Sequence, residues 1–271
     1  MKVTFATVPG SSSKPNEDAI AATSQVIAVI DGVTAPQGLE TGCVHGTPWY
    51  ARNLSSRIVV TEQSAIELRV VLARAIADVA DSHRATCDLE SEGTPSGTVA
   101  ILRLTDKSLD YLVLSDATVV IETVSGVIAV TDKGVEQVAG SLANAAKTAR
   151  VGTFERKTRL EEFVSEQRKW RNVKGGYWLA GAVPEAAEHA LVGSVPLSDV
   201  RSAAAMTDGA SSLVDLYAQL TWDEAPSRLA KVGPHGWIEH VRRVEVEDSD
   251  VTRWPRFKRG DDATLAYMEL D

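Results

Sequence analysis

Four apolar, β-branched runs follow one another in the middle of the chain, at residues 98–104, 109–115, 118–123 and 127–131. Only short polar breaks separate them, and runs bounded in this way are typical of β-strands. A helical crossover needs about a dozen residues, so strands this close in sequence cannot be parallel neighbours. The spacing therefore predicts an antiparallel meander with hairpin turns at the polar breaks.

Further strands are predicted near both ends of the chain, with helices between them. The runs 3–7 and 26–31 precede the meander, and the runs 203–207 and 264–270 follow it. Apolar residues at helical spacing and helix-start signals predict helices at 48–60, 64–84, 211–219, 223–232 and 236–247. Strands at both ends with helices inserted favour an α+β layered fold over an alternating parallel sheet. Because no linker or repeat interrupts the sequence, one domain is expected to fill residues 1–271.

The composition excludes several classes of protein. A chain of 271 residues, 44% of them apolar, can bury a sizeable core, which excludes a disordered protein. The net charge of -9 offers no basic surface to a phosphate backbone, so nucleic acid is not an expected partner. No window approaches the roughly 18 uninterrupted apolar residues of a membrane span. Residues 1–10 also lack the apolar core of a signal peptide, so a cytoplasmic protein with no membrane partner is predicted.

Acidic residues stand where predicted strands end or begin. The four clusters are Asn16-Glu17-Asp18, Asp31-Gly32, Asp208-Gly209 and Asp261-Asp262. An Asp at a strand end projects its carboxylate beyond the sheet edge, and a following Gly leaves the backbone carbonyl open to a ligand. Hard cations such as Mg²⁺ and Mn²⁺ prefer these oxygen ligands. Taken singly, however, each cluster is explained as well by turn formation, because Asp-Gly and Asn-containing segments are common turn sequences.

The order of the clusters is more informative than any one of them. Six short motifs follow one another: Asn16-Glu17-Asp18, Val29-Ile30-Asp31-Gly32, Ser96-Gly97-Thr98, Leu114-Ser115-Asp116-Ala117, Met206-Thr207-Asp208-Gly209 and Gly260-Asp261-Asp262-Ala263-Thr264. In this order they resemble the motifs of the protein phosphatase 2C family, over residues 16–264. The resemblance implies a four-layer α-β-β-α sandwich, with two antiparallel sheets face to face, helices on both outer faces and a binuclear metal centre at one end.

The resemblance also implies how the metal centre is built. Asp31 would bridge two Mn²⁺ or Mg²⁺ ions, the carbonyl of Gly32 would hold the second ion, and Asp208 and Asp261 would complete the first. Two such cations lower the pKa of a shared water, which then attacks a phosphate ester without a phosphoenzyme intermediate. Asp31 and Asp208 would thus support catalysis through metal-activated water.

Other acidic residues take outer positions in the same comparison. Asp18 would act mostly through metal-bound waters, and Glu17 is a further candidate for this role. Asp116 corresponds to an acidic residue that can hold a third, weaker metal in bacterial relatives.

The sequence departs from the family near the expected phosphate site. The family's arginine, five residues before the metal-binding Asp of the Asn-Glu-Asp motif, is replaced by Ser13. Lys14 and Arg259 carry positive charges nearby and are candidates for binding the phosphate. The histidine that serves as general acid in many eukaryotic members falls at Val33, and many bacterial relatives lack it as well.

A long loop, residues 33–46, follows Gly32 where the family continues with two glycines, and it contains Cys43 and His45. His45 is a candidate for proton donation and substrate binding, because its ordinary pKa suits proton transfer. Two ligands are too few for a structural zinc site, and the other histidines form no matching pair. Cys43 and Cys87 are expected to stay reduced, since so few cysteines in so long a chain indicate thiols. The loop pair is therefore expected mainly to shape the loop.

Residues 151–196 correspond in position to the variable flap of the family. Basic and aromatic residues concentrate there, between Arg156 and Trp178. A charge run on a helix is often only a solvated face. Alternatively, the flap covers one side of the metal cleft, and Arg168, Lys169 and Arg171 attract an anionic substrate.

Three functions fit these observations. The leading interpretation is a Mg²⁺- or Mn²⁺-dependent phosphatase acting on phosphoserine or phosphothreonine in proteins. A small-molecule phosphatase acting on phosphorylated metabolites is the second, favoured by the missing arginine and the unusual loop. A non-catalytic binding or sensor module is the third, and the joint retention of Asp31, Asp116, Asp208 and Asp261 argues against it.

Overall fold

The structure is a computed structural model that describes residues 2–33, 40–62 and 65–270. Its strands form two five-stranded antiparallel sheets. Sheet A has the order β1 (Lys2–Val8), β10 (Ala263–Glu269), β9 (Val200–Met206), β6 (Thr118–Thr123) and β7 (Gly126–Thr131). Sheet B has the order β2 (Ala19–Ala22), β3 (Val26–Gly32), β4 (Gly97–Leu104), β5 (Ser108–Leu114) and β8 (Leu191–Pro196).

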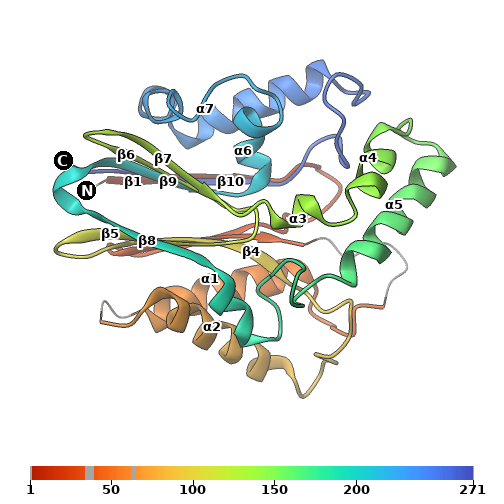
Figure 1. Ribbon diagram of the computed structural model, residues 1–271, viewed down its shortest axis with the longest axis horizontal. Coiled ribbons are helices and arrows are strands. Elements are labelled where there is room, and N and C mark those ends of the chain that lie inside the picture. The colour runs from red at the N-terminus through yellow and green to blue at the C-terminus, as the bar shows by residue number, and fades with distance from the viewer. Residues whose placement is uncertain (1, 34–39, 63–64, 271) are drawn as a thin grey trace.

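Helices cover the outer face of each sheet (Figure 1). α1 (Thr47–Thr61) and α2 (Leu68–His83) lie on sheet B, and α6 (Asp208–Asp215) and α7 (Ala225–Glu247) lie on sheet A. The layers therefore follow the order helix, sheet, sheet, helix. This arrangement confirms the predicted α+β class and the four-layer α-β-β-α sandwich.

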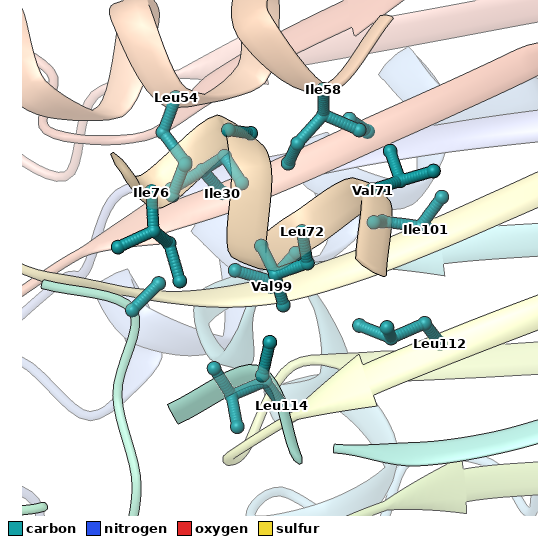
Figure 2. Packing of buried hydrophobic residues seen from close by; sticks show 14 of the residues in the cluster. Ile30, Leu54, Ile58, Val71, Leu72, Ile76, Val99, Ile101, Leu112 and Leu114 are labelled. Carbon is teal, nitrogen blue, oxygen red and sulfur yellow. The ribbon is translucent and has the colours of Figure 1, made fainter. Parts of the chain in front are cut away.

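Alternation along each strand supplies the two faces that the layers need, since successive side chains of a strand point to opposite sides. In β3, Ala28 and Ile30 pack against the helices, whereas Ile27 and Val29 pack between the sheets. Side chains of α1 and α2, such as the fully buried Leu72, close over the outer face of sheet B (Figure 2). A separate apolar cluster joins sheet A to α6 and α7.

The meander expected at residues 98–131 is wrong, because the two hairpins of this segment belong to different sheets. β4 pairs with β5 in sheet B, and β6 pairs with β7 in sheet A. The chain crosses between the sheets at residues 115–117, where Ser115 has a φ of 63°. Close spacing predicts the hairpins, but it does not show whether successive hairpins share a sheet. Asp116 stands at the crossing.

The helices follow the predictions with shifts at their ends. The helix predicted at 64–84 is observed as α2, and residue 64 lies outside the described residues. The helices predicted at 223–232 and 236–247 are the two halves of α7. A kink divides them, because Gly233 has a φ of 67° and Pro234 follows it. None of the described helices combines the length and the apolarity needed to cross a membrane.

The segment predicted as a flap, residues 151–196, has different limits in the structure. β8 is an edge strand of sheet B, paired with β5, so the end of this segment is part of the sandwich. α3 (Gly134–Gln137) and α4 (Gly140–Thr148) precede residue 151, and α4 packs against α5 (Phe154–Arg168). β8 has only six residues, and Gly193 and Ser194 interrupt its apolar pattern, so the strand does not stand out in the sequence. Short 3-10 helices flank this strand, η1 (Pro184–His189) and η2 (Leu197–Asp199).

One end of the sandwich collects the strand ends that carry the acidic motifs. The register shows this through the partners Asp31↔Thr98, Ala19↔Ile30, Val8↔Ala263 and Thr118↔Met206. β7 also finishes at this end, so α3, α4 and α5 stand beside it, at the right of Figure 1. Both chain termini lie at the opposite end.

Candidate functional site

The acidic side chains converge because several strands continue the same alternation beyond their last apolar residue. Asp31 follows Ile27 and Val29 on the face of β3 that points between the sheets. Thr207 and Asp262 take the corresponding positions at the ends of β9 and β10. Polar side chains thus replace the apolar core where the space between the sheets opens to solvent.

Asp18 is the most buried of these carboxylates, with 7% of its surface exposed. Its Oδ2 accepts a hydrogen bond of 2.9 Å from Oγ1 of Thr207, and its backbone N–H donates to Oδ1 of Asn16 over 2.9 Å. Its Oδ1 is buried without a hydrogen-bond partner in the described part of the chain. Burying a carboxylate oxygen without a partner costs free energy, so buried polar atoms normally have one. The unpartnered Oδ1 of Asp18 therefore indicates a place for a cation or a water molecule.

Asp208 and Asp261 approach Asp31 from sheet A. Asp208 is the first residue of α6, directly after β9, and its carboxyl group lies within hydrogen-bonding reach of Asp31. Asp261 precedes β10, and its Oδ1 accepts a hydrogen bond of 2.7 Å from Nζ of Lys258. Its backbone carbonyl accepts a 2.7 Å hydrogen bond from Nη2 of Arg242, which fixes this turn against α7.

The neighbouring Asp262 has a structural role. Its Oδ1 accepts a hydrogen bond of 2.7 Å from the amide of Gly10, and its Oδ2 accepts one of 2.7 Å from the amide of Glu17. One carboxylate therefore ties the loop between β1 and β2 to the start of β10. The two adjacent residues therefore have different roles. Asp261 lies close enough to Asp31 for its charge to raise the pKa of Asp31, and Asp262 binds the backbone amides of Gly10 and Glu17.

Gly32 lies where the sheet end and this loop approach most closely. A Cβ at this position would collide with the backbone oxygen of Glu17 and would come within 2.5 Å of Cγ2 of Thr47. Only glycine therefore fits between the Asn-Glu-Asp segment and the start of α1. The close approach keeps Asp18 and Asp31 on one side of the same small space.

Burial and mutual repulsion raise the pKa of these Asp side chains, and burial contributes most in each case. The pKa of Asp18 rises to about 8, that of Asp116 to about 7 and that of Asp208 to about 6. The pKa of Asp31 rises well above its usual value, through burial and through the charges of Asp208, Asp18, Asp261 and Asp116. Four other carboxylates thus act on Asp31 at the centre of the cluster.

The donor set fits a hard divalent cation. Carboxylate oxygens are what Mg²⁺ and Mn²⁺ prefer, and bound cations would relieve the repulsion around Asp31. The unpartnered Oδ1 of Asp18 supports this fit, as do the buried hydroxyls of Ser96, Thr98 and Thr118, which have no hydrogen-bond partner among the described residues. Oxygen ligands and free hydroxyls together are suited to cations that keep several waters.

Comparisons with known proteins identify the family of the chain. A family model, described as Protein phosphatase 2C, matches residues 10–239. The chain belongs to the protein phosphatase 2C family. Among curated proteins, none matches the sequence.

Solved structures of bacterial phosphatases share the fold of this protein phosphatase 2C member. The Staphylococcus aureus serine/threonine phosphatase Stp1 is 13% identical, with a TM-score of 0.57, over 100% of this chain and 95% of Stp1. The catalytic domain of PstP, in complex with two manganese ions, is 11% identical, with a TM-score of 0.56, over 100% and 98%. The Mycobacterium tuberculosis phosphatase PstP/Ppp is 13% identical, with a TM-score of 0.54, over 100% and 98%.

A cavity of about 520 Å³ opens beside the carboxylates of this family member. Asp116, Asp208 and Asp261 line it on the side of the sandwich. On the other side it reaches α4 and α5, which turn Lys147 and Phe163 toward it. Helices outside the sandwich therefore form one wall of the candidate site.

Lys258 was not among the phosphate-binding residues predicted from the sequence. It lines the cavity beside the acidic cluster with 45% of its side chain exposed, whereas the proposed phosphate ligands Lys14 and Arg259 do not line the cavity. Burial opposes a charge on Lys258, but the carboxylates of Asp261, Asp31 and Asp208 raise its pKa above the usual value. The only signal in the sequence was its position three residues before Asp261.

The basic run of α5 and the following loop serves the fold more than the cavity. Arg156 donates to the carbonyls of Lys147, Ala149 and Phe257, and Arg171 donates to the carbonyl of Thr94 over 3.0 Å. Neither residue lines the cavity, and neither do Arg168 and Lys169. The interpretation that this run attracts the substrate therefore finds no support in the geometry. The basic residues that line the cavity are Lys133, Lys147, Arg256 and Lys258.

His45 also lies away from the cavity lining. It stacks on Trp49 with ring centroids 4.3 Å apart and lies beside Cys87, which the sequence analysis did not connect with it. Most of the loop 33–46 that was expected beside the metals, residues 34–39, lies outside the described residues.

We expect Mn²⁺ to stabilise the protein more strongly as the pH rises. Asp18, Asp116 and Asp208 have pKa values of about 8, 7 and 6, above an unfolded value of about 4. The metal-free folded state thus binds more protons than the unfolded chain between about pH 4 and pH 8, and its stability falls as the pH rises through this range. Mn²⁺ displaces these protons, so the increase in Tm over an EDTA-treated sample should be larger at pH 8 than at pH 5. Equal increases at both pH values, measured by scanning calorimetry, would contradict the assignment.

Proposed function

We propose that this protein is a Mn²⁺- or Mg²⁺-dependent phosphatase that hydrolyses phosphoserine and phosphothreonine in proteins. The observation that carries the proposal is the convergence of five carboxylates on one end of the sandwich, with an unpartnered buried oxygen on Asp18. Membership of the protein phosphatase 2C family and the likeness to bacterial serine/threonine phosphatases support it.

Asp31, the carbonyl of Gly32, Asp208 and Asp261 would hold two cations, with Asp31 shared between them. When bound, such cations lower the pKa of water to near neutrality and neutralise the oxygens of a phosphate ester. Four other carboxylates act on Asp31 and raise its pKa, and this central position supports its role as a ligand shared by both cations.

Outer positions fall to three further acidic residues. Asp18 and Glu17 would orient water around the cations, and Asp116 would hold a third, weaker cation together with Asp208. Asp116 lines the cavity, and the charge of Asp208 helps to raise its pKa, so its position supports this role.

The residues of the cavity argue against a covalent cysteine or histidine intermediate. No cysteine or histidine is found among the described residues that line it. A thiolate or imidazole nucleophile, or a histidine acting as general acid, therefore has no candidate next to the carboxylates. Lys258 is placed to bind the phosphate oxygens as a point charge, in place of the arginine that Ser13 replaces.

A metabolite phosphatase is a second candidate, and two observations favour it. The family's arginine is missing at Ser13, and the cavity of about 520 Å³ has the size of a small-molecule site. Hydrolysis rates for a panel of phosphopeptides and a panel of phosphorylated metabolites separate the two, because the enzyme should have the higher kcat/KM for its own substrate class.

Asp208→Asn should lower the metal-dependent hydrolysis of p-nitrophenyl phosphate and of a phosphothreonine peptide by at least about 100-fold, as for loss of a directly acting electrostatic group. The neutral amide keeps the shape of the side chain and removes the charge that attracts the cation. Asp106→Asn, an exposed position in the β4–β5 turn, is the matched control and should retain full activity. Circular dichroism establishes that both variants are folded. A folded Asp208→Asn protein with wild-type turnover would refute the proposed centre.

Lys258→Gln should raise KM for p-nitrophenyl phosphate about 10-fold or more, since a hydrogen bond to a charged group is worth about 1.5–3 kcal/mol. Lys14→Gln, an exposed position that does not line the cavity, should leave KM unchanged. The measurement is steady-state kinetics at saturating Mn²⁺, so that a change in metal affinity does not affect KM. An unchanged KM in Lys258→Gln would mean that Lys258 serves only to pair with Asp261.

A further inference from the structure

Cys43, His45 and Cys87 form a second cluster of metal-binding side chains, outside the carboxylate site. Cys43 and His45 come from the segment before α1, and Cys87 comes from the turn after α2. The two sulfur atoms are 3.4 Å apart. Nδ1 of His45 lies 3.8 Å from Sγ of Cys43 and 3.3 Å from Sγ of Cys87. Three donor atoms from two distant segments thus form a compact triangle.

The triangle has the size that a tetrahedral zinc ion requires. With Zn–S bonds of about 2.3 Å and Zn–N bonds of about 2.0–2.1 Å, the donor atoms around zinc stand roughly 3.5–3.8 Å apart. The observed separations are 3.3, 3.4 and 3.8 Å, so small side-chain shifts bring all three atoms to bonding distance of one ion. Two sulfurs and an imidazole are ligands for a soft or borderline cation, unlike the oxygen ligands of the carboxylate cluster.

The backbone holds these ligands in place before any ion binds. Gly42 has a φ of 68°, and a Cβ there would come within 2.6 Å of the side chain of Ser91. The Gly42 carbonyl accepts a 2.8 Å hydrogen bond from the amide of Asp88, which joins the two segments directly. The amide of His45 donates to Sγ of Cys43 over 3.4 Å. Outer hydrogen bonds of this kind orient metal ligands and preorganise a site.

Aromatic side chains enclose the triangle on the side of α1 and α2. His45 stacks on Trp49, and the buried His83 packs edge-on against both rings, with centroids 5.8 Å and 5.0 Å away. Nδ1 of His83 lies 2.6 Å from the carbonyl of Val79, so it carries the ring proton. In the neutral ring, Nε2 of His83 therefore carries a lone pair. This nitrogen is buried and has no hydrogen-bond partner in the described part of the chain. His83 is not among the residues whose ligand atoms lie within 4.8 Å of one another in this cluster, so a water molecule would complete the coordination of an ion held by the three side chains.

We propose that Cys43, His45 and Cys87 bind a Zn²⁺ ion, in a site that is separate from the carboxylate centre and structural in role. Binding forms two Zn–S bonds and one Zn–N bond and releases the thiol protons to solvent. The ion would fasten the segment before α1 to the end of α2. The segment continues into Thr47, which packs against Gly32 and donates to the carbonyl of Val33 over 3.3 Å. A zinc ion there would brace the backbone beside the carboxylates without taking part in hydrolysis.

A disulfide between the cysteines is the competing state, and the geometry favours the metal. The sulfur separation of 3.4 Å far exceeds a disulfide bond of about 2.05 Å. A disulfide also leaves the imidazole of His45 without a function, although it lies close to both sulfurs.

Cobalt(II) tests the proposal in the full-length protein, because Co²⁺ replaces zinc and gives a sulfur-to-metal charge-transfer band that oxygen ligands do not produce. Reduced, metal-stripped protein titrated with Co²⁺ should develop this band at one Co²⁺ per chain, and Zn²⁺ should abolish it. Cys87→Ser and His45→Ala should weaken Co²⁺ binding at this site by more than about 100-fold, since even outer-shell changes cost 10–100-fold. His235→Ala, an exposed histidine on α7, and Asp208→Asn should keep the band.

The wild-type protein alone can overturn the proposal, whatever the fate of the variants. Absence of the thiolate band in the reduced protein would exclude the site. So would unchanged reactivity of Cys43 and Cys87 toward a thiol reagent in the presence of Zn²⁺, or a band that forms in Cys87→Ser at the same Co²⁺ concentration as in the wild type. Loss of the band in Asp208→Asn would assign it to the carboxylate centre instead.

Discussion

The repulsion among carboxylates at one end of the sandwich is the constraint on which the site depends. Asp31 is surrounded by Asp18, Asp116, Asp208 and Asp261. Burial keeps water from fully solvating the charges of Asp18, Asp31, Asp116 and Asp208. Without a cation, the folded protein keeps several of them protonated near neutral pH. The fold thus stores an unfavourable electrostatic arrangement that bound divalent cations would convert into a favourable one.

The two-sheet architecture is what makes such crowding possible. Each sheet has apolar side chains on the face that meets the other sheet. By the same alternation, the next side chains on this face are Asp31 at the end of β3 and Thr207 after β9. The crossing between the sheets puts Asp116 at the same end. The carboxylate of Asp262 accepts hydrogen bonds from two backbone amides, and these bonds hold the loop between β1 and β2 close to the site. Packing between the sheets and placement of the site are therefore consequences of one alternating pattern.

Much of this could be predicted from the sequence, and the exceptions have physical reasons. Asp31-Gly32 and Asp208-Gly209 were found because a strand followed by Asp-Gly is a local pattern. The meander at residues 98–131 was wrong because hairpin spacing contains no information about which sheet a hairpin joins. Lys258 was missed because its role depends on the fold around Asp261, and the partnership of Cys43 with Cys87 because 44 residues separate them in the chain. Local chemistry is visible in a sequence, whereas contacts between distant segments have to be seen in the structure.

Anomalous diffraction from a crystal soaked in MnCl₂ would show whether a binuclear centre forms at Asp31, because it locates manganese without reference to activity. We expect two strong peaks about 4 Å apart, both within bonding distance of the carboxylate of Asp31. Asp208 and Asp261 should be ligands of one of them. A map with no peak next to Asp31, and with Nζ of Lys258 still the nearest cation to Asp261, would contradict the binuclear centre.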